Sequence, residues 1–399
     1  MKALLVVPRL PGTGFTGDRV RVEMHIEALK LAGFEIVLVG GAPSGEGIGA
    51  LEGVSSVRPV PFSHAGFPFA LAAAAFRGDP LQSALQAGPW ARALAGAGDR
   101  FDLVVWSLVR IWPHVRGRLP GAPVVLDFID ALAAGADQAA ERDPAGWRRL
   151  YWRVESPRLA RAQKQAAFNA SALLSTTQRD ASLLPAGTEA LLHGVKLGPR
   201  PDASPREPVV AFSGRLGYRP NQLAARTLIE DLWPSVRRAV PEARLVLGGA
   251  DAPRELGRLD GKGGVSVVSP VAEMPAFLRR ARVVAVPLEL GTGLPNKLLE
   301  AFEAGAAVVA SEDSVSRASL ASARAPALAA RTRQEFVDGL ISYLRDPSKA
   351  AADGAAGRDF VERHGDRRRA VERLASVFRD AAEGVVPRPR PLAASESIH

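Results

Sequence analysis

The stretch PLELGTGLPNKLLEAFEAGAAVVAS, residues 287–311, contains the pattern that decides the fold. An apolar strand ends at Pro287, a turn with two glycines follows, and a helix begins near Pro295. A second apolar strand, residues 307–310, comes next. A strand, a glycine turn, a helix and a further strand form the repeating unit of a parallel sheet with helices on both faces.

The turn in this stretch also has the composition of an anion site. Gly291 and Gly293 give the backbone freedom, and the N–H groups at the start of the helix carry the positive end of its dipole. Lys297 adds a full positive charge, and Glu300 lies on the first helical turns. Such a site suits a diphosphate attached to a group with hydroxyls, such as a sugar. On these residues alone, a plain turn with a solvated lysine and glutamate stays open as an alternative.

A second glycine turn, FSGRLGYRPN at residues 212–221, has similar features. Gly214 follows an apolar strand, and Arg215 can hold a phosphate with two hydrogen bonds. Asn221 could cap the next helix or contact a ligand. Taken by itself, this turn favours the alternative, a surface arginine in a turn with Pro220 at the start of the helix.

Outward from these two turns, the same alternation of strands and helices runs through the chain on both sides of a linker. The linker is GPRPDASPREP, residues 198–208, with four prolines and no apolar periodicity. Strand candidates before it are residues 3–7, 34–39, 103–106, 124–128 and 172–175, and those after it are 209–212, 244–247, 265–268, 283–286 and 307–310. The sequence therefore predicts two doubly wound parallel-sheet domains, residues 1–197 and 209–360. A long helix over 361–382 is expected to pack back on the first domain, and residues 384–399 are expected to be disordered.

Composition excludes several kinds of chemistry. The 399 residues include no cysteine, which removes disulfides, cysteine–zinc sites, iron–sulfur clusters and a thiol nucleophile. None of the six histidines lies at ligand spacing from another, and no Asp-x-Asp occurs, so we expect no bound metal and no other cofactor. A serine nucleophile elbow, Gly-x-Ser-x-Gly, is also absent. The net charge of +9 favours an anionic partner.

No segment resembles a signal peptide or a membrane span. The longest apolar stretch, around residues 67–76, is about half the length that a span requires. We expect a cytoplasmic protein, with the inner face of the membrane as an alternative location. The basic stretch 142–164 contains Trp147, Tyr151 and Trp152, a composition that suits an anionic bilayer surface. It suits equally a helix with aromatic residues in the core and solvated arginines. No basic run resembles a nucleic-acid-binding motif, so nucleic acid is not an expected partner.

Three motifs, in this order and spacing, resemble those of GT-B glycosyltransferases, in particular the large retaining family 4. They are DFID at 127–130, YRPN at 218–221 and GLPNKLLEA at 293–301. The likeness extends over residues 1–382. Within this family, the chain most resembles sugar transferases of bacterial exopolysaccharide clusters. It implies the GT-B fold, two Rossmann-like domains that face each other across a cleft. It also implies a nucleotide-sugar donor.

The resemblance further implies roles for individual residues. Glu300 matches the glutamate that binds the donor ribose, Arg215 the arginine that binds the diphosphate, and Gly17 a glycine whose backbone approaches the donor phosphate. Lys297 would supply a second positive charge. The remaining donor-site positions are Gly214, Asn221, Gly291, Thr292, Gly293, Leu294 and Asn296. Two positions depart from the family pattern, because Thr292 stands where the first glutamate of its Glu-x7-Glu motif would be and Asn221 stands near the place of a lysine.

In the first domain, Asp127 and Asp130 follow a buried strand. Two carboxylates at a strand's carboxyl end suit the binding of an acceptor hydroxyl or the handling of its proton. Many relatives have a His-Asp pair here, and Ile129 occupies the place of the histidine. Capping of the next helix by Asp130 stays open. Residues 193–196, HGVK, resemble a turn that joins the domains.

The leading hypothesis is a retaining, metal-independent glycosyltransferase of hexosyltransferase type. Its acceptor would be a glycan, a lipid-linked molecule or a small molecule of cell-surface polysaccharide or glycoconjugate biosynthesis. The alternative is a non-catalytic nucleotide-sugar-binding scaffold in a glycan-assembly complex, which the departure at Thr292 favours. Gly248-Gly249 after a strand also suggests an NAD(P)-dependent oxidoreductase, but Gly-x-Gly-x-x-Gly between a strand and a helix is absent.

Overall fold

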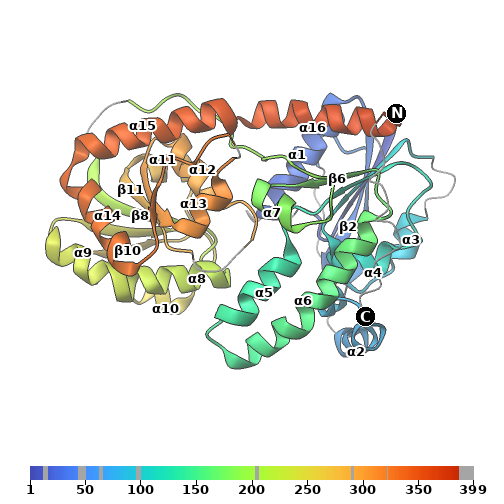
Figure 1. Ribbon diagram of the computed structural model, residues 1–399, viewed down its shortest axis with the longest axis horizontal. Helices are drawn as coiled ribbons and strands as arrows, with labels where there is room; N and C mark the ends of the chain where they lie inside the picture. The colour runs from blue at the N-terminus through green and yellow to red at the C-terminus, as the bar shows by residue number, and fades with distance from the viewer. Residues whose placement is uncertain are drawn as a thin grey trace.

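The structure, a computed structural model, describes residues 1–11, 17–43, 51–62, 66–95, 100–202, 206–288, 292–320 and 322–385. Its strands form two separate sheets, one in each half of the chain, which lie toward opposite ends of an elongated molecule (Figure 1). Helices cover both sheets, so the predicted α/β fold with two parallel-sheet domains is confirmed. The tail that was predicted to be disordered lies outside the described residues from 386 onward.

The first sheet has seven strands in the order β3-β2-β1-β4-β5-β6-β7, and each neighbouring pair is parallel. Successive residues of β1 and β4 point to opposite faces, and both faces are buried. Helices on both sides therefore explain why these strands are continuous apolar runs. The strands are β1 Lys2–Val7, β2 Glu35–Pro43, β3 Ser56–Phe62, β4 Leu103–Ser107, β5 Val124–Asp127, β6 Ala172–Ser175 and β7 Thr188–Ala190.

The helices of this half lie between the strands. They are α1 Gly17–Leu31, α2 Phe67–Arg77, α3 Trp90–Leu94, α4 Trp112–Val115, α5 Leu132–Arg142, α6 Gly146–Ala167 and α7 Gln178–Leu183, with short 3-10 turns η2 Leu81–Gln86 and η3 Val109–Ile111. The alternative that Asp130 caps the next helix is wrong. The N-cap of α5 is Ala131, and no side chain caps it.

The second sheet has six strands in the order β10-β9-β8-β11-β12-β13, again all parallel. Its strands are β8 Glu207–Ser213, β9 Arg244–Gly248, β10 Val265–Val268, β11 Ala281–Val286, β12 Ala307–Ser311 and β13 Leu328–Ala330. Its helices are α8 Arg219–Arg226, the π-helical turn η4 Thr227–Leu232, α9 Trp233–Ala239, α10 Arg254–Gly257, α11 Met274–Arg279, α12 Asn296–Glu303, α13 Glu312–Ala318, α14 Arg333–Arg345 and α15 Pro347–His364.

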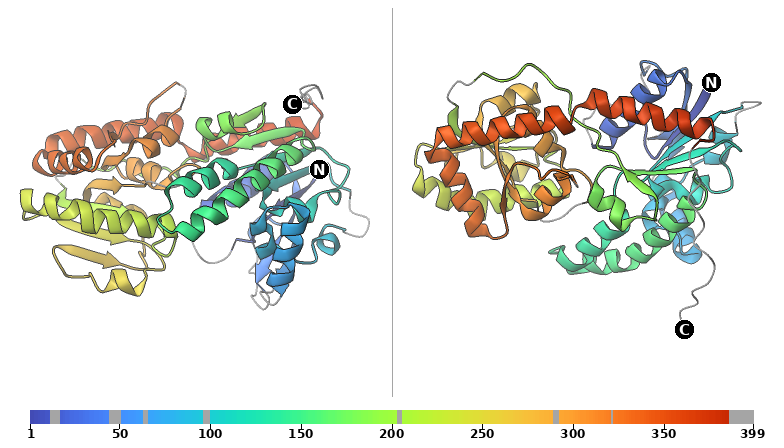
Figure 2. Two further views of the ribbon diagram at one scale, coloured as in Figure 1. Left: turned by 60° about the horizontal axis from the view of Figure 1, so that its bottom comes forward. Right: turned by 45° about the horizontal axis from the view of Figure 1, so that its top comes forward.

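The predicted single helix over 361–382 is two helices. Helix α15 ends at His364, and α16, Arg367–Ala382, begins after Asp366, whose side chain caps it by accepting from the Arg368 N–H. The chain then crosses to the other half, where α16 packs on α1 (Figure 2, right). Leu374 and Phe378 are fully buried in the core between the first sheet and helices α1 and α16.

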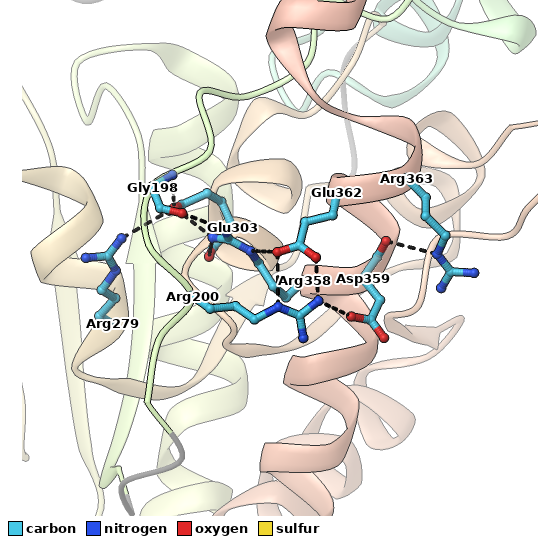
Figure 3. A network of polar contacts seen from close by, with 8 residues as sticks. All are labelled: Gly198, Arg200, Arg279, Glu303, Arg358, Asp359, Glu362 and Arg363. Carbon is cyan, nitrogen blue, oxygen red and sulfur yellow. Dashed lines mark hydrogen bonds and ion pairs between the residues drawn. The ribbon is translucent and has the colours of Figure 1, made fainter.

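The predicted linker is anchored at its beginning to the second domain (Figure 3). The Gly198 N–H donates to Glu303 Oε1 at 3.0 Å, and Arg358 donates to the Gly198 carbonyl at 2.6 Å. Arg358 also donates to Glu303 Oε1 at 3.0 Å, and Arg200 is paired with Glu362. The last two predicted linker residues belong to β8, which begins at Glu207. The buried ion pair of Arg358 and Glu303 therefore fixes the beginning of the connection between the two sheets.

Candidate active site

The carboxyl ends of β8 and β11 lie next to each other in the second sheet, and the two glycine turns follow them. Gly214, directly after β8, has a φ of +138°, and a Cβ built there would lie 3.0 Å from Asn221 Nδ2 and 3.2 Å from Lys297 Nζ. A side chain at this position would displace two predicted site residues. The glycine therefore allows α8 and α12 to bring their polar side chains to one point.

Lys297 is the centre of this group. It lies in the first turn of α12, its side chain is buried, and its Nζ donates to Asn221 Oδ1 at 2.9 Å. The same Nζ lies 4.2 Å from the centre of the Phe212 ring. Burial lowers the pKa of Lys297 to about 7, against the opposing influence of Glu300. An ammonium group with so low a pKa gains strongly from any anion placed beside it.

Glu300 lies one helical turn beyond Lys297 on α12 and is half-buried. Burial raises the pKa of Glu300, and the nearby Lys297 opposes that rise. The two opposite charges therefore share one partly desolvated site, as the sequence predicted.

Arg215 contacts the group around Lys297 through its backbone, whereas its side chain is paired with Asp251. Its carbonyl accepts from Asn221 Nδ2 at 2.8 Å, while its guanidinium Nε donates to Asp251 Oδ2 at 2.6 Å. The pair with Asp251 is about half exposed, with side-chain exposures of 47% and 56%. Such exposed ion pairs contribute at most about 1 kcal/mol, so a diphosphate can displace Asp251 at little cost.

The loop before α12 contacts the first domain. Thr292 Oγ1 donates to Asp130 Oδ2 at 3.1 Å, and Gly293, with a φ of +75°, lies against the Asp130 side chain. Leu294 packs against the core of the second domain. Gly291, the other predicted glycine of this loop, lies outside the described residues.

A residue that sequence analysis missed supports this loop. Arg317 on α13 is buried and donates to the carbonyl oxygens of Thr292 and Gly293, at 3.4 Å and 3.1 Å. Its guanidinium also lies 2.9 Å from the Asp313 carboxylate. No local pattern marks this support, because the two carbonyl groups that Arg317 holds are 24 and 25 residues earlier in the chain.

Asp127, at the end of β5, is fully buried and fully occupied. Its Oδ2 accepts from Arg21 Nε at 2.6 Å and lies 2.8 Å from His25 Nε2, and its Oδ1 accepts from the Ile129 N–H at 2.9 Å. Burial acts to raise the pKa of Asp127, but Arg21 and His25 outweigh it and hold the pKa well below its usual range. This geometry argues against the predicted contact between Asp127 and an acceptor, since no face of the carboxylate is open to one.

Asp130, three residues on, has the opposite environment. One of its oxygens accepts from Thr292, and the other, Oδ1, is buried without a hydrogen-bond partner in the described part of the chain. Burial raises the pKa of Asp130 to about 6, opposed by Arg110 and assisted by Asp180. A buried carboxylate with an unused oxygen is suited to accept or hold a proton.

The backbone between the two aspartates is strained. Ile129 has a φ of +63°, in the left-handed region that β-branched residues rarely adopt. Its N–H donates to Asp127, and its carbonyl accepts from both the N–H and the hydroxyl of Thr176. These three hydrogen bonds hold a conformation that costs about 1–3 kcal/mol, and the resulting bend separates the directions of the two carboxylates.

Sequence analysis treated His193 only as part of a turn, but it contacts the donor half. Its Nε2 lies 2.7 Å from Asn296 Oδ1, and burial lowers its pKa to about 3. The ring is therefore neutral, and Nε2–H donates to Asn296. Gly17, the predicted phosphate-approaching glycine, is the first residue of α1.

Two ion pairs also join the domains. Arg219 on α8 lies 3.0 Å from Asp143, and Arg179 on α7 is paired with Asp313. Beside them, a hollow of about 360 Å³ lies between the end of α5 and the carboxyl ends of β11 and β12. Its lining residues are Arg142, Leu288, Ser311, Glu312, Asp313, Ala330 and Arg331. Of the predicted residues, Asp130 of the first domain and Thr292 and Gly293 of the second are thus brought together at a junction, and this hollow lies beside that junction.

Comparison with known proteins agrees with this arrangement. Residues 207–346 match the family model described as Glycosyl transferases group 1. No curated protein sequence matches the chain. The matched residues lie in the second domain, and the match supports the predicted class of enzyme, a glycosyltransferase.

Solved structures share the fold over both domains of the chain. Sucrose-phosphate synthase from Thermosynechococcus elongatus is similar with a TM-score of 0.68 and 16% identity, over 96% of this chain and 100% of that one. HepE of Anabaena in complex with UDP-glucose gives 0.62 and 14%, over 94% and 99%. WaaG, a glycosyltransferase involved in lipopolysaccharide biosynthesis, gives 0.62 and 14%, over 95% and 99%. The predicted GT-B fold is confirmed, whereas membership of family 4 stays a prediction.

Proposed function

We propose that this chain, whose second domain matches the group 1 glycosyltransferase family, transfers a sugar from a nucleotide-sugar to an acceptor hydroxyl. The observation that carries the proposal is the group of Lys297, Asn221 and Gly214, which lies at the carboxyl ends of β8 and β11. Ligands of parallel sheets bind at this edge. The adjoining loop reaches Asp130 of the other domain through Thr292, so that the donor and acceptor halves meet.

The donor diphosphate would lie against the N-terminus of α12. Lys297 and the helix N–H groups would neutralise it, and Arg215 would exchange Asp251 for a phosphate oxygen. Glu300 would accept hydrogen bonds from ribose hydroxyls. As the bond between the sugar carbon and the diphosphate oxygen breaks, these cations stabilise the negative charge on the leaving diphosphate. Because protein cations provide this stabilisation, we propose a metal-independent reaction.

The acceptor hydroxyl would approach from the first domain. Its oxygen forms the new bond to the sugar carbon, and its proton moves to an oxygen of the departing diphosphate. Asp130, which is only partly buried and accepts one hydrogen bond in the described residues, would orient the hydroxyl through its carboxylate. Retention of configuration is proposed from the resemblance to family 4, in which the donor phosphate is thought to assist deprotonation.

The substrates and the pathway are proposed at the level of class. HepE was solved with UDP-glucose, and WaaG is involved in lipopolysaccharide biosynthesis. We therefore propose UDP-sugars as the first donors to test, and a cytoplasmic role in cell-surface polysaccharide or glycoconjugate biosynthesis.

The test is a thermal-shift panel of UDP-, GDP-, ADP- and TDP-sugars, followed by assays of sugar transfer and donor hydrolysis. One donor class should stabilise the wild-type chain, and the double variant Arg215→Ala/Lys297→Ala should lose that shift and nearly all turnover. Glu300→Ala should weaken donor binding while the fold stays intact. Lys349→Ala is the matched control, because Lys349 also lies over an aromatic ring, that of Tyr343, but on α15. Wild-type turnover in the double variant would refute the placement of the diphosphate.

The same panel tests the alternative of a non-catalytic scaffold. In this structure a threonine hydroxyl, not a carboxylate, faces Asp130 from position 292. Tight nucleotide-sugar binding with neither transfer nor hydrolysis would favour the scaffold and overturn the catalytic proposal.

A further inference from the structure

One face of α6 is largely exposed in the described residues. Positions 147, 150, 154, 157, 161, 164 and 168 repeat at alternating intervals of three and four, which places them along one side of the helix, and all seven are exposed. The first four are Trp147, Leu150, Val154 and Pro157, the next two are Arg161 and Lys164, and the last is Phe168 just after the helix. Trp147 is 70% exposed, Leu150 64% and Phe168 75%.

This exposure corrects the interpretation that the aromatic residues of this stretch all belong to the core. Trp152 does pack against the first domain's core, and the Tyr151 ring meets the Trp152 ring edge-on at 4.8 Å. Trp147 points away from that core, with Arg148 over its ring at 4.7 Å.

Helix α2 shows the same pattern more strongly. Its sequence FPFALAAAAFR is apolar at every position but the last, yet only Ala74 is buried. Phe69, Ala72 and Phe76 repeat with the spacing of one helix face, and Phe69 and Phe76 are 81% and 95% exposed. Exposing this apolar face to water is unfavourable, so the hydrophobic effect favours a partner that covers it.

The end of α2 lies close to the middle of α6. The N–H groups of Leu81 and Gln82, which follow α2, donate to the Glu155 carboxylate in the middle of α6 at 2.7 Å and 3.0 Å. Gly78, the C-cap of α2, lies so close to Arg161 that a Cβ there would be 2.9 Å from its Nη1. In Figure 1 and Figure 2, α2 is drawn near the part of α6 that contains these contacts.

The exposed charges of helices α2 and α6 are all positive. Helix α6 carries six basic residues and one acid, Glu155, which is buried and consumed by the two N–H groups described above. Helix α2 has no acid and ends in Arg77. Apolar side chains that project between cations, without an exposed acid on either helix, complement a surface that is anionic outside and apolar below.

We propose that the exposed faces of α2 and α6 form a docking surface for an anionic phospholipid bilayer. Phe69, Phe76, Trp147 and Leu150 would enter the boundary between head groups and acyl chains, while Arg161 and Lys164 would contact lipid phosphates. None of the helices in the described residues is long and apolar enough to cross a membrane, so the contact would be peripheral.

The docked chain would present the site to the bilayer. Trp147 lies four residues after Asp143, whose carboxylate pairs with Arg219 of the second domain at 3.0 Å. The apolar end of the α6 face therefore begins at the domain junction. An acceptor anchored in the lipid would have a short path to the place where the domains meet. The docking itself does not depend on the identity of the donor.

The test is co-sedimentation of the full chain with vesicles, either of phosphatidylcholine alone or with roughly one-third phosphatidylglycerol. The wild-type chain should bind the anionic vesicles preferentially, and salt should weaken the binding. Trp147→Gln/Leu150→Gln and Phe69→Gln/Phe76→Gln should each lower the partition coefficient about tenfold or more. Arg161→Gln/Lys164→Gln should lower it about fivefold per cation removed.

The matched control is Arg368→Gln/Arg369→Gln, which removes two exposed cations from α16 and should bind nearly as the wild type does. Circular dichroism checks that each variant is folded. Equal binding of the wild type and the apolar variants would overturn the proposal, as would equal binding to neutral and anionic vesicles. If instead the apolar variants convert a dimer to a monomer in sedimentation velocity without changing vesicle binding, the face is an interface between copies and the proposal fails.

Discussion

Asp127 and Asp130 lie three residues apart at the end of one strand, and the protein treats them in opposite ways. Asp127 accepts from Arg21 and the Ile129 N–H and contacts His25, and its pKa is held far below the usual range. Asp130 has a single bond, from Thr292, and burial raises its pKa to about 6. Asp127 is fully buried and Asp130 is partly buried, and burial acts to raise the pKa of both, so burial alone does not separate a structural aspartate from a reactive one.

The number and sign of the partners make the difference. Asp127 has two basic partners from α1, which stabilise its charge and, in turn, are held in place by it. In the described part of the chain the Asp130 carboxylate accepts one hydrogen bond. Arg110 favours its charge, but burial outweighs Arg110, and the nearby carboxylate of Asp180 disfavours the charge further. A charge that is fully paired stabilises the fold, whereas one that is incompletely paired costs stability and remains available to a substrate.

The largest expected effect is on the Asp127 side of the comparison. Asp127→Asn leaves the Arg21 guanidinium buried without its counter-ion, so we expect the free energy of unfolding to fall by about 3–5 kcal/mol. Urea denaturation at neutral pH measures the loss. Asp137→Asn, an exposed aspartate on α5, is the control and should change the stability by less than about 0.5 kcal/mol. If Asp127→Asn kept full stability but lost activity, Asp127 would act in the reaction and would not be a structural residue.

Asp130→Asn should act in the opposite direction. Because the folded pKa is raised, the folded chain binds the proton more tightly than the unfolded chain, and stability falls as pH rises from about 4 to about 6. A shift from 3.8 to about 6 corresponds to at most about 3 kcal/mol. The variant should therefore be more stable than the wild type at pH 7 by up to that amount, and nearly equal at pH 4. Urea titrations across this range test it, and a difference that does not vary with pH would contradict the raised pKa.

Lys297 extends the comparison to a buried cation. Lys297→Met keeps the length of the side chain but removes its charge, so binding of the donor diphosphate should weaken by about 1.5–3 kcal/mol, or about 10- to 150-fold. Isothermal titration with the preferred nucleoside diphosphate gives the affinity. The burial that lowers the pKa of Lys297 to about 7 also predicts that wild-type affinity falls as pH rises from 6 to 8. An affinity in Lys297→Met equal to that of the wild type would place the diphosphate elsewhere.

The smallest effect concerns the single bond that Asp130 does have. Thr292→Val removes that bond with little change of shape, and because the bond favours the charged carboxylate, the pKa of Asp130 should rise further. The expected stability change is about 1 kcal/mol or less. In urea titrations, the pH at which stability falls because Asp130 loses its proton should move upward. The same displacement in Thr292→Ser, which keeps the hydroxyl, would show that the bond is not its cause.

Much of the fold could be predicted from the sequence, since strands buried on both faces are continuous apolar runs. Strand β3 was missed because Ser56–Phe62 contains Pro59 and Pro61 and an arginine, and only its pairing with β2 at the sheet edge makes it a strand. The break between α15 and α16 was missed because a single Gly-Asp pair interrupts an otherwise helical pattern.

The candidate site divides in the same way. Residues close in sequence were found together, such as Lys297 and Glu300 on α12, because glycine turns and helix starts are local signals. Arg317 and His193 were not, because their contacts with the loop and helix of the donor half come from 24 or more residues away.

By itself, the sequence determined that there are two parallel sheets, which strand ends carry glycine turns, and where a lysine and a glutamate stand on the helix that follows. Only the tertiary structure decided which buried charges are paired. Arg21 reaches Asp127 across 106 residues, and Thr292 reaches Asp130 across 162. Local pattern cannot encode such contacts, because the burial and the partners that set a side chain's protonation arrive only when distant elements pack together.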